Sequence, residues 1–180
     1  IASCLVGSEM CIRDRLWSCT TCRACVEECP MMIEHVDAIV GLRRFQTLEL
    51  GAVPPKAEES LARLRTADEI GGRPLGARGD FAAGLALPLL AETGQAEILL
   101  WLGEGAYDMR YQRTLRALVR LMHRAGVDFA VLGSEERDCG DTARRLGDEA
   151  TFQRLARLNI ETLSRYRFGR IPVSYTHLTL

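Results

Sequence analysis

Four of the seven cysteines crowd into residues 19–29, at the spacing of metal ligands. The run comprises Cys19, Cys22, Cys25 and Cys29 and is followed by Pro30. Bacterial ferredoxins hold iron–sulfur clusters with this pattern, Cys-x2-Cys-x2-Cys-x3-Cys-Pro. Thiolates three residues apart on a tight turn reach three irons of one cubane, while the intervening backbone N–H groups offset the negative charge of the cluster. The run therefore predicts binding of a [4Fe–4S] cluster.

The fourth cysteine of such a run usually ligates the other cluster of a pair. We expect Cys19, Cys22 and Cys25 to bind one [4Fe–4S] cluster and Cys29 to bind a second. Because the chain carries a single run of this kind, the remaining ligands would lie in a sister motif upstream. The run is thus half of a two-cluster site in the full-length protein.

A zinc site is the alternative, because zinc also prefers thiolate ligands. Structural zinc sites more often use two Cys-x2-Cys pairs separated by a longer loop. In this alternative the protein would be a non-redox interaction module. His35 lies close to the run, and at a helix start we expect a polar or capping role for it rather than metal ligation.

The composition is typical of a soluble globular domain. The formal net charge is -1 and 26% of the residues are charged, values that are ordinary for a soluble globular domain and give no electrostatic reason to expect nucleic acid. No apolar run is long enough to span a bilayer. Clustered rather than dispersed cysteines favour a reducing, cytoplasmic compartment over a disulfide framework.

Both ends of the chain, residues 1–15 and 172–180, resemble translated sequencing-adapter sequence. We expect them to be non-native tails, and we therefore set aside Cys4, Cys11 and His177 as ligands. The alternative is that both ends are genuine flexible termini.

Helical spacing continues beyond the cysteine run as far as Gly51. Residues 16–50 are therefore assigned to the second half of a two-cluster ferredoxin-type domain. Residues 51–95 read as a linker, with a short exposed helix over 56–70 and a glycine-rich loop after it.

Residues 96–171 have the pattern of an incomplete α/β domain. An apolar run over 98–102 predicts a buried strand, and a helix with one apolar face and outward arginines follows it. A second strand is expected over 127–132, which completes a parallel βαβ unit. Asp148 then looks like the N-cap of a further helix, and Ile171 would begin a third strand.

A second candidate site follows from this topology, because ligands in α/β sheets bind beyond the carboxyl ends of the strands. Glu104 lies in a Gly-Glu-Gly loop after the first strand, and Asp138 and Cys139 follow the second strand. The two loops would form one crevice. The alternative is a buried, inert cysteine beside a simple glycine turn. Nucleotide binding is disfavoured, because the loop lacks the third glycine of the dinucleotide fingerprint.

Two stretches carry a family likeness. Leu16 to Phe45, which includes the cysteine run, resembles the second ferredoxin motif of heterodisulfide-reductase-related iron–sulfur proteins. Leu100 to Leu163 resembles the start of their cysteine-rich (CCG) domain. Within it, the segment Trp101 to Asp108 is most similar to the iron–sulfur proteins of dimethylglycine catabolism. Where the wider family has cysteine, this sequence has Glu104 and Asp138, so the second domain reads as a docking or vestigial scaffold.

The resemblance implies a function for the full-length protein. It would relay electrons from oxidative demethylation of a small N-methylated amine, such as dimethylglycine, through two [4Fe–4S] clusters towards flavin and quinone. The implied partners are electron-transfer-flavoprotein-like subunits. A missing amino-terminal segment would anchor the protein at the inner face of the cell membrane.

Overall fold

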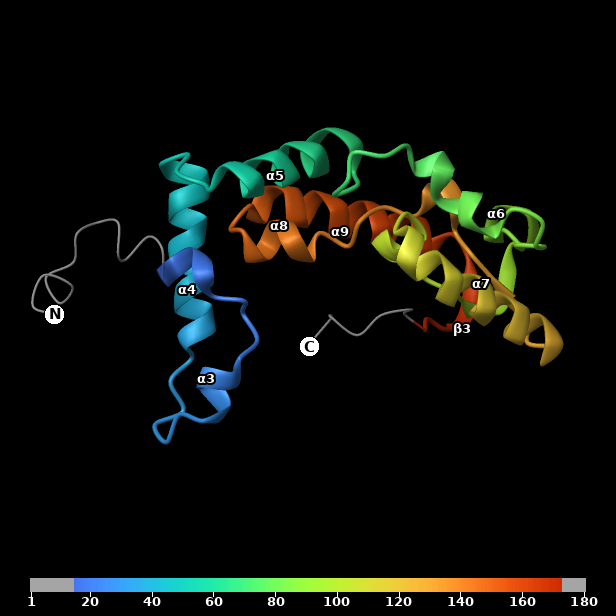
Figure 1. Ribbon diagram of the computed structural model, residues 1–180, viewed down its shortest axis with the longest axis horizontal. Helices are drawn as coiled ribbons and strands as arrows, with labels where there is room; N and C mark the ends of the chain where they lie inside the picture. The colour runs from blue at the N-terminus through green and yellow to red at the C-terminus, as the bar shows by residue number, and fades with distance from the viewer. Residues whose placement is uncertain (1–14, 173–180) are drawn as a thin grey trace, which may run out of the picture.

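A parallel sheet organises the carboxyl-terminal half of the chain. The computed structural model describes residues 15–172, and within this range three strands pair in the order β2-β1-β3 (Figure 1). The strands are β1 (Gln95–Leu99), β2 (Phe129–Ala130) and β3 (Arg167–Arg170). Both pairings of β1 are parallel, which confirms the α/β fold class predicted from the sequence.

Helices account for most of the remaining regular structure between residues 15 and 172. The α-helices are α3 (Ala24–Glu27), α4 (His35–Arg44), α5 (Pro55–Ala67), α6 (Leu90–Thr93), α7 (Met109–Arg124), α8 (Asp141–Arg145) and α9 (Glu149–Ser164). A π-helical turn, η1 (Phe45–Glu49), continues α4, and three 3-10 segments are η2 (Leu75–Ala82), η3 (Gly103–Ala106) and η4 (Gly133–Glu135). In this part of the chain, no helix is both long and apolar enough to cross a membrane.

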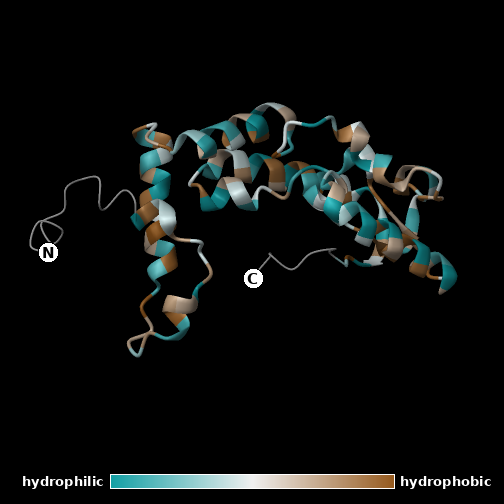
Figure 2. Cartoon of the chain, viewed as in Figure 1, coloured by the Kyte–Doolittle hydropathy of each residue, from teal (hydrophilic) through white to brown (hydrophobic). Residues whose placement is uncertain are grey.

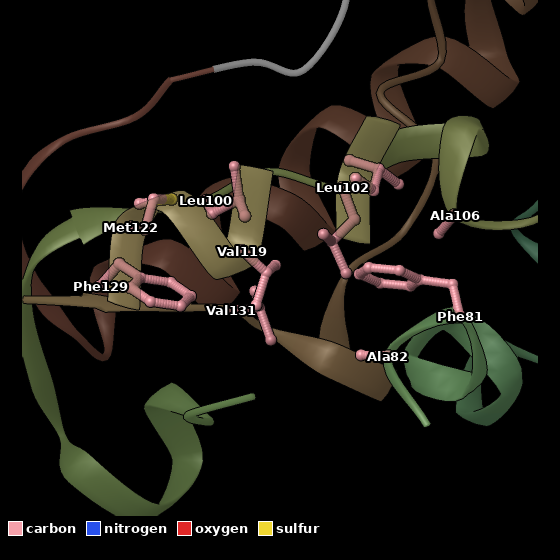
Figure 3. Packing of buried hydrophobic residues seen from close by; sticks show 10 residues of the cluster. Phe81, Ala82, Leu100, Leu102, Ala106, Val119, Met122, Phe129 and Val131 are labelled. Atoms are coloured by element: carbon pink, nitrogen blue, oxygen red, sulfur yellow. The ribbon is translucent and has the colours of Figure 1, made fainter. Parts of the chain in front are cut away.

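Helix α7 connects β1 to β2 and covers one face of the sheet. Its N-cap Asp108 accepts a hydrogen bond from the Arg110 N–H at 2.9 Å, which satisfies one of the free donors of the first turn. The buried side of the helix carries Leu115, Val119 and Met122. Figure 3 shows Val119 and Met122 packed with Phe129 and Val131. The amphipathic helix predicted between two strands is therefore confirmed.

The third strand begins before its predicted position. β3 covers Arg167–Arg170, and Ile171 follows the strand instead of opening it. The prediction was wrong because β3 is an edge strand with mostly exposed side chains, and such a strand lacks the apolar run by which buried strands are recognised. Among the residues of β3, Phe168 packs against the hydrophobic cluster on this face of the sheet.

The segment predicted as a linker packs against the α/β domain. Leu61 and Leu64 of α5 are fully buried in a cluster with Leu155 of α9, so the expectation of an exposed helix was wrong. Arg78 and Phe81 of η2 are also buried. Two leucines are enough to pack α5 against the domain, because α8 and α9 supply the other side chains of the cluster. The domain boundaries themselves stay predictions.

The cysteine run lies at the end of the molecule farthest from the sheet. We call residues 19–34 the cluster arm; it includes α3 and projects beside α4, away from the α/β domain (Figure 1). Thr21 is the single buried residue of the arm. Hydrophobic positions occur along α4 and the loop before it (Figure 2), and Met31, Met32 and Phe45 are more than half exposed. Cys4, Cys11 and His177 of the expected tails lie outside the described residues.

Candidate iron–sulfur site

The backbone of the cluster arm is shaped around its thiols. Thr21 and Arg23, on either side of Cys22, have left-handed backbone angles with φ of 59° and 62°. This conformation is uncommon for residues with a Cβ and turns successive N–H groups towards one side. The Thr21 N–H donates to the Cys19 Sγ at 3.4 Å. Cys19 and Cys29 are half-buried, while Cys22 and Cys25 are exposed.

Hydrogen bonds to two of the sulfurs favour the thiolate form. The backbone of Ala24 and the side chain of Thr20 lower the pKa of Cys22. The backbone of Ile33 and then the His35 side chain lower the pKa of Cys29. Because a thiolate is the form that ligates metal, both contacts suit a ligand. The contact of His35 with Cys29 was not expected from the sequence, where a histidine at a helix start looks like a polar or capping residue.

The donor set fits an iron–sulfur cluster by its chemistry. Thiolate sulfur is the soft ligand that such clusters use, and N–H groups directed at the sulfurs offset the cluster charge. Across residues 15–172, no three His, Cys, Asp or Glu side chains are gathered in a metal-binding arrangement. The three thiols predicted to share one cluster are thus not gathered around a common point in this structure, and the assignment of each cysteine stays a prediction.

A buried arginine holds the start of the arm. Arg43 of α4 is 3% exposed, and its Nη2 donates to the carbonyl oxygens of Cys19 at 2.6 Å and Leu16 at 2.7 Å. Its guanidinium group also stacks on the Trp17 ring at 5.2 Å. On the opposite side, Nη1 donates to the Arg145 carbonyl at 2.9 Å. One side chain thus joins the arm to α8 of the α/β domain.

Further contacts fasten α4 to the turn between α8 and α9. The Thr47 hydroxyl donates to the Leu146 carbonyl at 2.6 Å, and Arg44 forms an ion pair with Glu149 at 2.7 Å. Gly147 has a φ of +86°, and a Cβ there would lie 2.4 Å from the carbonyl carbon of Arg43. Glycine is therefore required for this close approach of two backbones.

The second candidate site is built differently from the predicted crevice. The two loops are joined by Glu136, whose carboxylate accepts hydrogen bonds from the N–H groups of Leu102 at 3.0 Å and Gly103 at 2.6 Å. Arg78 donates to the same carboxylate at 3.1 Å and to the Gly103 carbonyl at 2.6 Å. Both side chains are at most 1% exposed. A buried ion pair therefore occupies the junction of the loops.

The predicted residues of this site have different surroundings. Glu104 lines a pocket of about 400 Å³ together with Glu69, Arg73 and Asp108, whereas Asp138 and Cys139 do not line it. Burial raises the pKa of Asp138, and the nearby Glu104 adds to this against a hydrogen bond from the Gly140 N–H.

Cys139 has the environment of a protonated thiol. Burial, followed by the charge of Asp138, raises its pKa to about 11. A thiol with that pKa is almost entirely protonated at neutral pH and is a poor nucleophile. This environment favours the inert alternative for Cys139, and a ligand role for it stays a prediction.

A family match covers most of the carboxyl-terminal half of the chain. Residues 99–173 match the model of the cysteine-rich domain named CCG. The resemblance to CCG-domain iron–sulfur proteins predicted from the sequence is thereby confirmed. No solved structure matches the chain significantly.

Three curated relatives align with nearly the whole chain. It is 62% identical to the "Probable membrane-anchored ferredoxin" of Chromohalobacter salexigens over 95% of this chain and 26% of the relative. It is 39% identical to the "EtfAB:quinone oxidoreductase" of Syntrophomonas wolfei over 96% of this chain and 24% of the relative. Identity to the "Probable iron-sulfur-binding oxidoreductase FadF" of Bacillus subtilis is 38%, over 96% of this chain and 26% of the relative. The chain thus spans about a quarter of the length of these relatives.

Proposed function

We propose that the full-length protein is an electron carrier in which Cys19, Cys22 and Cys25 ligate one [4Fe–4S] cluster and Cys29 ligates a second. The observation that carries this proposal is an exposed arm with ferredoxin spacing, whose backbone N–H groups are directed at its sulfurs. When bound, such a cluster accepts and donates single electrons with little rearrangement. The chain itself supplies the thiolates, the N–H groups and the exposure that brings a redox partner close.

The proposed partners are an electron-transfer flavoprotein as donor and a membrane quinone as acceptor. Support comes from the relative named as an EtfAB:quinone oxidoreductase and from the relative named as a membrane-anchored ferredoxin. The protein would then work at the inner face of the cell membrane. Oxidative demethylation of dimethylglycine or a similar amine as the electron source rests on the sequence resemblance alone, because none of the three relatives' names contains that substrate.

Metal analysis and EPR of the full-length protein test the cluster assignment. After anaerobic purification and reduction, we expect iron and sulfide in equal amounts and the EPR signals of two cubanes. Cys22→Ser should remove about half of the iron, since one of two four-iron clusters loses a ligand. Cys29→Ser should remove a similar amount by disrupting the other cluster. Cys139→Ser is the matched control and should leave the iron content unchanged.

A different metal would overturn the proposal. One zinc per chain without sulfide would establish the non-redox alternative, in which the cysteine run is structural. Loss of about half of the iron in Cys139→Ser would instead place a ligand in the second domain.

A further inference from the structure

Arg43 is unusual among the arginines of the described chain because three carbonyl oxygens and an aromatic ring surround it. Nε and Nη2 donate to Leu16, Nη2 also donates to Cys19, and Nη1 donates to Arg145. Within residues 15–172, Arg43 forms no ion pair with a carboxylate. A buried cation with this surrounding keeps its charge, because an arginine in a protein stays protonated.

The charge of Arg43 lies beside the first predicted ligand. The four hydrogen bonds of Arg43 all go to backbone carbonyl oxygens, which carry no formal charge. A buried charge is costly unless an opposite charge compensates it. Because Nη2 donates to the carbonyl of Cys19 itself, a cluster ligated by Cys19 would bring the compensating negative charge close to the guanidinium group.

The hydrogen bonds of Arg43 also fix where Cys19 lies. The carbonyl of Cys19 itself is an acceptor at 2.6 Å, and the Leu16 carbonyl anchors the preceding turn at 2.7 Å. The Arg145 carbonyl, 102 residues away, sets the guanidinium plane against the α/β domain. A single side chain therefore links the backbone at Cys19 to α8.

We propose that Arg43 is a positioning residue for Cys19: it clamps the start of the cluster arm to the α/β domain and places a fixed positive charge next to the cluster that Cys19 ligates. The electrostatic half of this inference rests on the proposed function. A positive charge stabilises the reduced, more negative cluster, so Arg43 raises the reduction potential.

Hydrogen exchange of the chain without a cluster tests the clamp independently of any iron. In Arg43→Gln, we expect amide exchange over residues 16–22 to accelerate roughly tenfold or more, since several hydrogen bonds from a charged group are lost. Arg44→Gln is the matched control, because the neighbouring Arg44 has the same charge but pairs with Glu149. Amides of α7 serve as an internal reference for correct folding. Unchanged exchange over residues 16–22 would overturn the clamp.

Redox titration of the cluster-loaded, full-length protein tests the charge. Arg43→Gln should shift the reduction equilibrium about tenfold towards the oxidised form, which is about 59 mV for one electron. Arg43→Lys keeps the charge but loses the planar fork, so its potential should stay near that of the wild type while its exchange over residues 16–22 is accelerated. Arg44→Gln should shift the potential much less.

The two measurements separate the possible failures. Faster exchange with an unchanged potential in Arg43→Gln would mean that the residue is structural only and would overturn its electrostatic role. A full-length protein that binds no iron–sulfur cluster would overturn the proposed function and, with it, the electrostatic role. Hydrogen exchange would then be the remaining test of whether Arg43 clamps the start of the cluster arm.

Discussion

Arg78 and Glu136 form an ion pair that water does not reach. Their oxygen–nitrogen distance is 3.1 Å, and the side chains are 1% and 0% exposed. Burial raises the pKa of Glu136, while Arg78 and two backbone N–H groups oppose the shift. The Nε and Nη2 atoms of Arg78 are buried without a hydrogen-bond partner. Most of the compensation for the Arg78 charge therefore depends on one carboxylate.

Removal of that carboxylate should destabilise the protein strongly. We expect Glu136→Gln to lower the free energy of unfolding by about 3 kcal/mol or more, because an unpaired charge is left in the core. Urea denaturation followed by circular dichroism measures the change. Glu58→Gln, which breaks an exposed pair with Arg65, should cost less than about 1 kcal/mol. Equal effects of the two variants would contradict the assigned role of Glu136.

Asp148 couples stability to pH. Burial opposes its ionisation, but the Thr151 N–H and hydroxyl and the Arg65 guanidinium lower its pKa overall. Since the folded pKa lies below the unfolded value of about 3.9, the contribution is complete above that value and is lost as the pH falls through the folded pKa. Asp148→Asn removes the charge that these groups stabilise, and it should lower the free energy of unfolding by about 1 kcal/mol at neutral pH.

The effect of Asp148→Asn should therefore shrink in acid. Urea midpoints of wild type and variant, compared near neutral pH and again below about pH 3, measure this convergence. Glu97→Gln on the exposed side of β1 controls for general charge effects. A constant difference across this range would show that the charge of Asp148 contributes nothing.

At the scale of elements, α4 is held to the α8–α9 turn by backbone contact at Gly147. Its φ is +86°, and an added Cβ would meet the Arg43 carbonyl. Gly126 offers a matched comparison, because its φ is +64° but a Cβ there would meet nothing within 4 Å. The two glycines separate the conformational penalty from the steric one.

We expect Gly126→Ala to cost about 1 kcal/mol, the penalty of a left-handed residue with a Cβ. Gly147→Ala should lower the free energy of unfolding clearly more than Gly126→Ala does. It should also loosen α4, because α4 must move away from the added Cβ. Thermal denaturation gives the stability change, and hydrogen exchange of α4 amides locates it. Similar penalties with unchanged α4 exchange would mean that the α4 contact contributes little.

Elements whose signals are local were predictable from the sequence, whereas contacts between distant segments were not. The apolar stripe of α7 and the N-cap at Asp148 were both predicted, because periodicity and capping depend only on residues close together in the sequence. The burial of Leu61 was missed, since it depends on α9. Likewise, the spacing of the cysteines indicated their chemistry, but no neighbouring residue marks Arg43 or Glu136 as buried. Their partners lie 102 and 58 positions away, respectively.

At the scale of the whole molecule, the cluster arm and the α/β domain differ in how firmly they are packed. The α3 helix buries no residue, while the sheet packs between two hydrophobic clusters. Segments with few buried contacts open more readily than a packed core. Local opening should therefore begin in the arm.

Limited trypsin digestion measures this difference. In the chain without a cluster, we expect cleavage after Arg23, whose side chain is 43% exposed, to precede cleavage after Arg120 of α7 by roughly tenfold or more. Arg23→Gln removes the early site and should delay the first cut within the described part of the chain. Simultaneous appearance of both products would mean that the arm is as protected as the core.

The link between Arg43 and Arg145 also has a consequence for biosynthesis. The cysteine run and α4 leave the ribosome first, but the carbonyl that receives Arg43 follows 102 residues later. At ordinary translation rates this interval is on the order of ten seconds. During that time the nascent thiols have no completed surface to dock on. A cluster bound by this run would therefore meet a finished platform only after the carboxyl-terminal half has emerged.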